Sequence, residues 1–505
     1  MSLMDLTEEL LKRYRDEGYT FARAATKFDD STGLLQITMD EGRIDAIEFE
    51  GVSKDLAERM TEGFLVRPGE IFNRRTVRRA ITRLLEPTGG AIMLSPRAES
   101  GAAFTSSRDL GRRRESFELV DRNGRRVLVV HLRKRGGALT ASFGTEGRED
   151  WYSPVDGFAP AIGFGAMVFD PSRFNHTYFG GYVSYKFGPD RPGYSFGLER
   201  SLTSRPRVTF GFDLHDLTVS DDFWRLTQNE QSLVAVGYQK TFRDYYRRRG
   251  VQIHGTIRPV DGHEVLVAWR RDRHEPLQNT TEYSLFGKDH QTFRPNPLFG
   301  ESKVGALLLR YTWDSRVART ERLQGAHTRH LVDDLYGSSA GHDPGWRIEW
   351  TSEFASEKFG GGTTFRRHIL NARSYAALSP LQRLHSRLIL GLSDGALLPE
   401  RTFGLGGIGS VRGHEFKEVT GDKMVLINLE YLIGFNRPFG VSAFFDAGRA
   451  YDGRPSAQSN LAAERWLKGV GLGLLFGGGA RLDFAWKLDD IPDSLQILLR
   501  LSPTF

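Results

Sequence analysis

The sequence contains no cysteine, which excludes disulfide frameworks, thiolate metal sites and cysteine nucleophiles. Only 39% of its 505 residues are hydrophobic, and no apolar run reaches the roughly 18 residues that a membrane-spanning helix needs. A membrane is not excluded, because a spanning β-strand needs only about ten residues, half of them apolar. The 13 histidines lack the spacing of metal ligands, so we expect neither a metal nor a cofactor.

Positive charge is concentrated in one stretch, although the net charge is only +6. Arginines cluster near residues 108–135, at Arg112, Arg113, Arg114, Arg125, Arg126, Arg133 and Arg135. Such a cluster predicts contact with anionic lipid head groups or with an acidic partner. The alternative is the solvated face of a small domain. No nucleic-acid-binding motif accompanies the charge, so we do not expect nucleic acid as a partner.

The first 137 residues predict small α/β modules. Residues 44–137 predict a strand, two helices and two further strands, with the helices near 54–64 and 73–85 and the last strands near 115–121 and 125–134. Asn73 is the expected N-cap of the second helix, and Asn123-Gly124 is a hairpin signal between the last two strands. Residues 1–43, with a helix over 5–17 and strands near 19–27 and 33–39, predict the second half of another copy. Because the first strand and helix of that copy are missing, we expect the numbered chain to begin inside a module. No secretory signal is present.

From about residue 157 onward, short runs of alternating apolar and polar residues recur, divided by Gly, Pro and Asp turns. We expect strands to start near 157, 174, 193, 206, 231, 249, 264, 303, 344, 364, 383, 423, 438, 467, 479 and 495. About sixteen antiparallel strands is an even number, as a barrel with both ends on one side requires. Residues 138–145 also alternate. A seventeenth strand, however, would place the longest insertions, near 278–302 and 396–422, on the periplasmic side of the membrane, where short turns are expected. We therefore assign 138–156 to a linker and 157–505 to a closed transmembrane barrel.

The last strand has one apolar face and one mostly polar face. Its apolar positions are Leu495, Ile497, Leu499, Leu501 and Phe505, and they alternate with Gln496, Arg500, Ser502 and Thr504. A polar residue at every second position suits a strand with lipid on one side and a wet lumen on the other. A terminal strand that ends in Phe is typical of bacterial outer-membrane barrels.

The long insertion 396–422 is rich in glycine and contains one arginine of special interest. Its central run includes Gly406, Gly407, Gly409, Val411, Arg412, Gly413 and His414. Strand parity places Asp446 and Glu430 on the lumenal face. A guanidinium matches a carboxylate bidentately, so Arg412 could pin the loop to the wall through Asp446 or Glu430 if the loop folds inward. Glycines would let it descend as a narrow hairpin. The alternative is an Arg412 that is solvated in an external loop.

These motifs together resemble the Omp85 superfamily of outer-membrane assembly factors, translocation-assembly proteins and two-partner secretion transporters. The resemblance rests on Val411-Arg412-Gly413, on Phe444-Phe445-Asp446-Ala447-Gly448, on Trp313-Asp314-Ser315-Arg316 and on the terminal phenylalanine. The family places an aromatic residue where this chain has His414, so packing there departs from the pattern. Residues 40–51 resemble the polypeptide-transport-associated (POTRA) repeat. The expected fold class is thus α+β with periplasmic POTRA-like modules, followed by an all-β outer-membrane barrel.

The resemblance implies a non-enzymatic protein that inserts or translocates unfolded polypeptides. Its implied partners are outer-membrane lipid, lipopolysaccharide and accessory proteins. Three alternatives remain: a two-partner-type secretion pore gated by the Arg412 loop, a barrel that anchors or exports an upstream enzyme, and a passive porin. A porin would not need the POTRA-like module. A dinucleotide-like pattern at Gly404-x-Gly406-x-x-Gly409 lacks the helix it requires, and a nucleophile-elbow pattern at 337–341 lacks catalytic partners.

Overall fold

The computed structural model describes most of the chain. The described residues are all except 1–2, 30–31, 86–87, 89–91, 96–115, 135–137, 144–148, 171–174, 205–206, 261, 288–291, 317–343, 435–438, 454–464, 477–479 and 502–505. The chain divides into two compact units, made mainly of residues 1–136 and of residues 137–505. Each unit is described by itself.

The first unit is built from helices and short strands. Its elements are α1 (Leu3–Asp16), β1 (Arg23–Asp29), β2 (Leu34–Asp40), β3 (Ala46–Glu50), α2 (Lys54–Gly63), α3 (Arg74–Leu85), β4 (Ile92–Leu94), β5 (Phe117–Arg122) and β6 (Arg125–Lys134). β1 and β2 form an antiparallel hairpin. In the second sheet, β6 pairs parallel with β3 and antiparallel with β5 and β4. The predicted order of strand, helix, helix, strand, strand is therefore present, with β4 as an addition.

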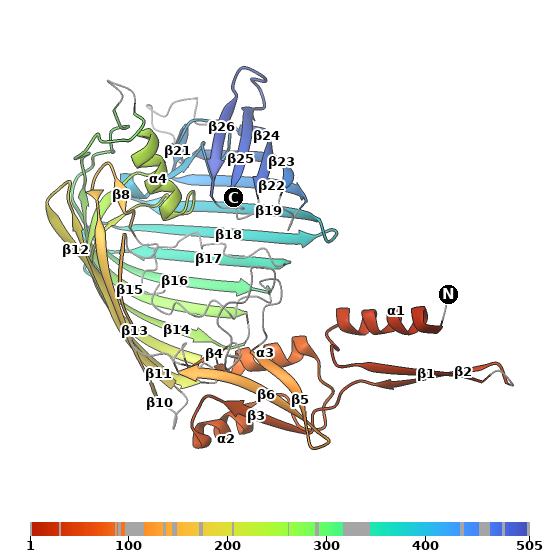
Figure 1. The fold of residues 1–505 in the computed structure, drawn as a ribbon. Coiled ribbons are helices and arrows are strands. Elements are labelled where there is room, and N and C mark those ends of the chain that lie inside the picture. Colours follow the sequence, from red (N-terminus) through yellow and green to blue (C-terminus); the bar gives the residue numbers. More distant parts are fainter. Residues whose placement is uncertain are drawn as a thin grey trace. The chain divides into compact units, whose positions relative to one another are not determined.

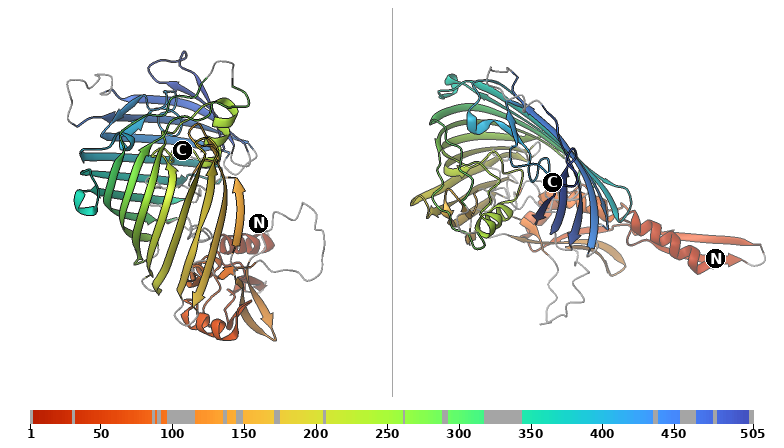
Figure 2. Two further views of the ribbon diagram at one scale, coloured as in Figure 1. Left: turned by 90° about the vertical axis from the view of Figure 1, so that its left-hand side faces the viewer. Right: turned by 90° about the horizontal axis from the view of Figure 1, so that it is seen from above.

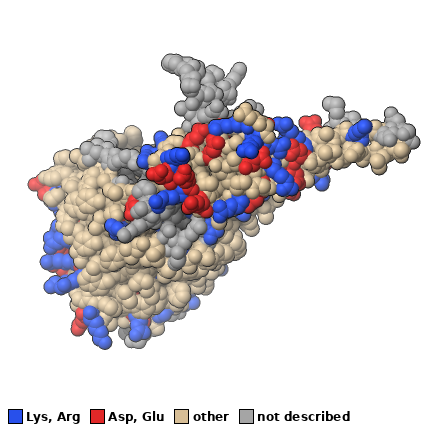
Figure 3. Space-filling model, turned by 90° about the horizontal axis from the view of Figure 1, so that it is seen from below, with Lys and Arg blue, Asp and Glu red and all other residues tan. Residues whose placement is uncertain are grey.

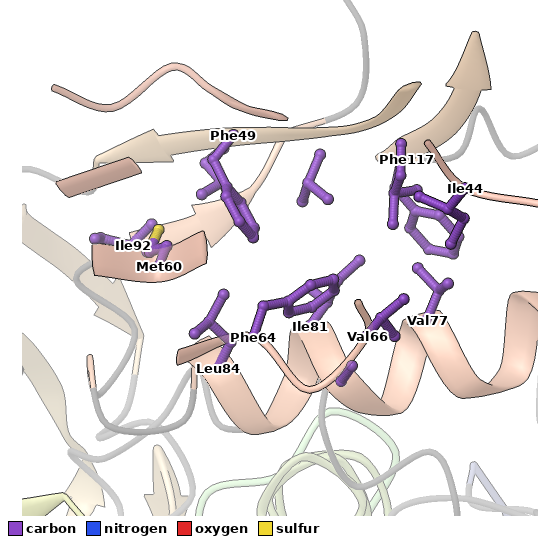
Figure 4. Close-up of a cluster of buried hydrophobic side chains, with 14 of the residues drawn as sticks. Ile44, Phe49, Met60, Phe64, Val66, Val77, Ile81, Leu84, Ile92 and Phe117 are labelled. Carbon is purple, nitrogen blue, oxygen red and sulfur yellow. The ribbon is translucent and has the colours of Figure 1, made fainter. Parts of the chain in front are cut away.

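Local signals explain these elements. The Asn73 side-chain oxygen accepts hydrogen bonds from the backbone N–H groups of Arg75 (3.0 Å) and Thr76 (3.2 Å), so it caps α3 as expected. Asn123 and Gly124 both have positive φ, at 56° and 78°, as the tight turn between β5 and β6 requires. The apolar stripe of α3 packs with α2 and the sheet in one core. Figure 4 shows side chains of this core, including Phe49, Met60, Ile81 and Phe117.

The second unit is dominated by one sheet of sixteen described strands. In order across the sheet they are β7 (Ala138–Phe143), β10 (Pro160–Asp170), β11 (Asn175–Lys186), β12 (Arg191–Ser204), β13 (Arg207–Val219), β14 (Tyr246–Arg258), β15 (His263–Pro276), β16 (Ser302–Asp314), β17 (Gly345–Ala355), β18 (Phe365–Ala377), β19 (Gln382–Gly395), β22 (Lys423–Ile433), β23 (Phe439–Tyr451), β24 (Leu467–Phe476), β25 (Arg481–Lys487) and β26 (Gln496–Arg500). Figures 1 and 2 show this sheet curving round. β7 and β26 are its two edges, and no pairing between them is found in the described part of the chain.

The two faces of the sheet have the opposite polarity to those of a soluble sandwich. Asp446 and Glu430 are fully buried, at 0% and 1% exposure, whereas their strand neighbours Phe445 and Leu429 are 36% and 41% exposed. The same alternation of enclosed polar and outward apolar side chains recurs in β13, where Thr209 and Asp213 are buried and Phe210 and Phe212 are exposed. Figure 3 shows a broad area over the sheet without Lys, Arg, Asp or Glu, with charged side chains gathered at its margins. Apolar outside and polar inside is the pattern of a barrel wall in lipid.

Two strand assignments made from the sequence are wrong, and their errors cancel in the total. Residues 138–143, assigned to the linker, form the edge strand β7, which pairs antiparallel with β10. The strand expected near 231 is instead the helix α4 (Gln228–Tyr238). The parity argument against a strand at 138–145 failed because it counted the helix as a strand. The first strand of the sheet is therefore β7 and not residues 157–169.

Short elements fill the connections. They are β8 (Tyr152–Ser153), β9 (Gly157–Phe158), η5 (Glu357–Phe359), η6 (Pro399–Arg401), β20 (Phe403–Leu405) and β21 (Val419–Gly421). Among the described residues, no helix combines the length and the apolar character needed to cross a membrane.

Candidate functional site: the anchored loop

The insertion 396–422 folds as a narrow hairpin. β20 pairs antiparallel with β21, and the Gly407 N–H donates to the Val411 carbonyl at 3.0 Å across the tip. Val411 is fully buried in a cluster with Phe403, Leu405 and residues of the wall strands. Apolar side chains alternate with glycines along this loop. The apolar side chains pack against the wall, and the glycines keep the hairpin narrow enough to fit in the enclosed space.

Two of the predicted loop glycines permit close backbone approaches. Gly409 has φ +72°, and a Cβ there would lie 2.4 Å from the carbonyl oxygen of Arg225. Gly413 has φ +88°, and a Cβ there would lie 2.5 Å from the carbonyl carbon of Trp486 on β25. Both the left-handed backbone and the close contact exclude larger residues. Gly406 and Gly407 also have positive φ.

Arg412 makes a bidentate contact with Asp446 of β23. Its Nε lies 2.7 Å from Asp446 Oδ2 and its Nη2 lies 2.9 Å from Asp446 Oδ1. The Arg412 backbone N–H also donates to Oδ2, at 3.1 Å. The guanidinium carbon lies 3.4 Å from the centre of the Phe444 ring. Asn428 Nδ2 donates to Asp446 Oδ1 and to the Ser410 carbonyl, each at 2.8 Å, so the wall holds both the carboxylate and the loop backbone.

The second predicted partner, Glu430, lies farther from Arg412. Arg412 Nη1 lies 3.8 Å from Glu430 Oε1. Glu430 instead forms an ion pair with Arg481 of β25, and Arg481 also contacts Asp483 at 2.7 Å. Asp483 Oδ2 accepts from Arg412 Nη1 at 3.3 Å. The sequence analysis did not identify Arg481 and Asp483 as site residues. They could have been found, because two opposite charges that are two residues apart lie on the same face of a strand.

His414 takes the place of the aromatic residue expected from the family pattern. Its Nε2 lies 3.1 Å from the Lys468 carbonyl oxygen and its Nδ1 lies 3.1 Å from Glu418 Oε2. The ring therefore fastens the loop to the start of β24 by polar contacts, where a phenyl ring would have only packing.

A second set of contacts joins the loop to the residues that precede α4. Arg225, which precedes α4, donates to the carbonyl oxygens of Gly404 (2.6 Å) and Gly406 (2.8 Å). Lys417 of the loop lies 2.8 Å from Asp222. These partners are distant in sequence, and no local pattern predicted them.

The terminal strand presents its predicted apolar face outward. Leu495, Ile497, Leu499 and Leu501 are all exposed, whereas Arg500 is buried. Phe505 lies outside the described residues. Within the described residues no cluster of three or more His, Cys, Asp or Glu side chains could hold a metal ion.

A wide antiparallel sheet with an apolar outer face, an enclosed charged face and an inward loop defines an outer-membrane barrel protein. Comparison with known protein families shows that residues 309–502 match the Omp85 superfamily domain. Residues 309–502 are therefore an Omp85 superfamily domain, and the protein that carries it is located in the outer membrane. The matched region contains the loop, Asp446, Arg481 and all of β26.

Several solved structures are similar to this chain. BamA from Haemophilus ducreyi lacking POTRA domains 1–3 is 14% identical with a TM-score of 0.47, covering 99% of this chain and 92% of that one. CdiB from Acinetobacter baumannii is 13% identical with a TM-score of 0.38, covering 98% and 80%. CdiB from Escherichia coli is 16% identical with a TM-score of 0.37, covering 98% and 82%. No curated protein matches the sequence.

Proposed function

We propose that this protein inserts polypeptides into the outer membrane, or translocates them across it, as an Omp85 superfamily protein. The observation that carries the proposal is the buried Arg412–Asp446 pair, which fastens an inward loop to the wall inside the superfamily domain. A bidentate pair of this kind fixes orientation as well as distance. The loop thereby gains a defined seat in the lumen.

The free edges of the sheet supply the mechanism. β26 and β7 are the two edge strands of the sheet in the described part of the chain, and such an edge can template an incoming strand by β-augmentation. Client polypeptides would pair there and leave as folded strands, so the free energy of client folding would drive the reaction. Outer-membrane phospholipid and lipopolysaccharide would contact the outward apolar face.

The first unit would receive clients before the sheet does. We propose that residues 44–137 form a POTRA-like periplasmic module and that residues 1–43 belong to a second one. β3 and β5 flank β6 in a small open sheet, whose edges suit capture of an extended chain. Accessory periplasmic or outer-membrane proteins would bind this unit.

A reconstitution experiment tests the proposal. The purified protein is placed in lipid vesicles, an unfolded outer-membrane barrel polypeptide is added, and the folded, protease-resistant client is measured over time. We expect faster client folding than in empty vesicles. Equal rates would contradict insertion. A client protected inside the vesicle lumen, instead of embedded in the bilayer, would identify the translocating secretion pore.

Two alternatives are less favoured by the geometry. A passive porin needs an open lumen, but here Arg412 of loop 396–422 binds Asp446 of the wall, and Asp221 lies 2.9 Å from Arg367 of β18. An anchor for an upstream enzyme would not need a loop fastened by a buried ion pair. We propose no catalytic role for the described residues.

A further inference from the structure

The helix α4 lies in the connection between β13 and β14, and its N-terminus is capped by the side chains of Thr227 and Glu230. The Thr227 Oγ1 accepts from the Glu230 N–H at 3.3 Å, and the Glu230 Oε2 accepts from the Thr227 N–H at 2.9 Å. This reciprocal capping box starts the helix. It uses one carboxylate oxygen of Glu230 and leaves the other for a different partner.

The other oxygen of Glu230 binds the edge strand of the large sheet. Oε1 accepts from the backbone N–H of Leu501 at 2.6 Å and from Arg500 Nε at 3.1 Å. Glu230 and Arg500 are both buried. Within the described residues β26 pairs only with β25, and the Glu230 carboxylate accepts from the amide at the end of this edge strand. Figure 1 shows α4 beside β26.

The segment that carries Glu230 also touches the anchored loop. Arg225 donates to the carbonyls of Gly404 and Gly406, while its own carbonyl accepts from Arg500 Nη2 at 3.4 Å. The loop, residues 220–239 and the end of β26 are thus joined by consecutive hydrogen bonds. We name residues 220–239 the α4 segment.

We infer that the α4 segment is an edge latch. Glu230 occupies the Leu501 amide in the resting protein, and the carbonyl of an incoming client strand replaces it there. The client is thus an extended polypeptide whose backbone oxygen competes with a carboxylate for one amide. Because Arg225 binds the loop, release of Glu230 also frees the loop from that side. This inference rests on the proposed insertion function and names the residues that control access to the edge.

The chemistry of the side chain explains why a carboxylate is needed. Its two oxygens both accept, so one serves the helix cap and the other serves β26. In Glu230→Gln one position becomes an NH₂ group, which would face an N–H donor at either end. The amide therefore cannot satisfy both the cap and the edge. Thr227→Ala is the matched control, since it weakens the cap and leaves the Glu230 contacts to Leu501 and Arg500.

Hydrogen exchange measured by mass spectrometry on the full chain in lipid nanodiscs tests the latch. In Glu230→Gln we expect exchange of the peptide that covers residues 496–501 to rise by about tenfold, because a buried charge-assisted hydrogen bond is lost. In Thr227→Ala exchange should rise in α4 and stay unchanged in β26. Unchanged exchange at β26 in Glu230→Gln would overturn the inference, and so would an equal rise at β26 in both variants.

Client folding in vesicles separates this inference from the function on which it rests. We expect Glu230→Gln to insert clients severalfold faster than wild type, since the edge is already free. If the wild type is active and the variant is no faster, the latch is wrong. If neither is active while the exchange result holds, the insertion function is wrong and the edge contact remains. Should Glu230→Gln fail to fold, Glu230→Asp keeps the charge, shortens the reach and is expected to raise β26 exchange.

Discussion

Arg412 is surrounded by carboxylates, so its removal leaves buried negative charge without compensation. In Arg412→Met the contacts to Asp446 and Asp483 are lost although the side-chain length is similar. Breaking a buried pair typically costs about 3–5 kcal/mol, and we expect the loop to leave its seat. The temperature at which the folded form unfolds on a heat-shift gel should fall, and the loop should become protease-sensitive.

A surface pair provides the control for that variant. Arg273 and Glu301 form an ion pair with side chains 43% and 54% exposed. Arg273→Met should leave the unfolding temperature close to that of the wild type, because exposed pairs are screened by solvent. Equal losses in the two variants would show that burial of the Arg412 pair contributes nothing.

Gly413 tests the close approach of loop and wall. Gly413→Ala places a methyl 2.5 Å from the Trp486 carbonyl carbon at φ +88°, so either the loop or β25 must shift. Strain of this kind costs about 1–3 kcal/mol, and client folding in vesicles should slow. Gly300→Ala is the matched control, because its Cβ would meet no atom within 4 Å. A Gly413→Ala protein as active as Gly300→Ala would mean that the loop seat is not needed.

At the scale of elements, an ion pair joins β2 to β6 in the first unit. Arg126 donates to both oxygens of Asp40, with Nη1 at 2.8 Å from Oδ1, and this lowers the pKa of Asp40 from 3.8 to about 2. A lowered folded-state pKa means that the contribution to stability is complete above pH about 4 and is lost as the pH falls through about 2. Because both side chains are partly exposed, we expect about 0.5–1 kcal/mol.

Comparison of Asp40→Asn with wild type measures this contribution. The variant should unfold more easily at pH 7, as judged by hydrogen exchange in β2, and the difference should vanish near pH 2. Glu58→Gln, at an exposed position of α2, serves as the control. A difference that persists undiminished at pH 2 would contradict the assigned cause.

Elements whose side chains repeat with a clear period were predictable from the sequence. Asp446 and Glu430 could be placed on the enclosed face because a strand alternates every second residue. α4 was missed because its apolar residues imitate a short strand, although Thr227 and Glu230 carry the spacing of a capping box. The contact of Arg225 with the Gly404 carbonyl joins segments far apart in the chain, and no local pattern encodes such a contact.

At the scale of the whole sheet, the two edges decide how a client would enter. The sequence placed the first edge at 157–169, whereas the structure places it at β7. A covalent lock must therefore join β7 to β26, with one cysteine introduced on each of these edge strands. The absence of native cysteine makes such pairs unambiguous.

A locked edge separates the two routes through the membrane. If clients enter by pairing with β26, the oxidised double-cysteine protein should lose client folding in vesicles and recover it after reduction, because a disulfide prevents the edges from separating. Either single-cysteine variant should stay active under oxidation, which controls for the substitutions themselves. Full activity of the locked protein would mean that the edges do not part during the reaction. The client would then have to pass through the enclosed space beside the Arg412 loop, and the loop would be the moving element instead of the sheet.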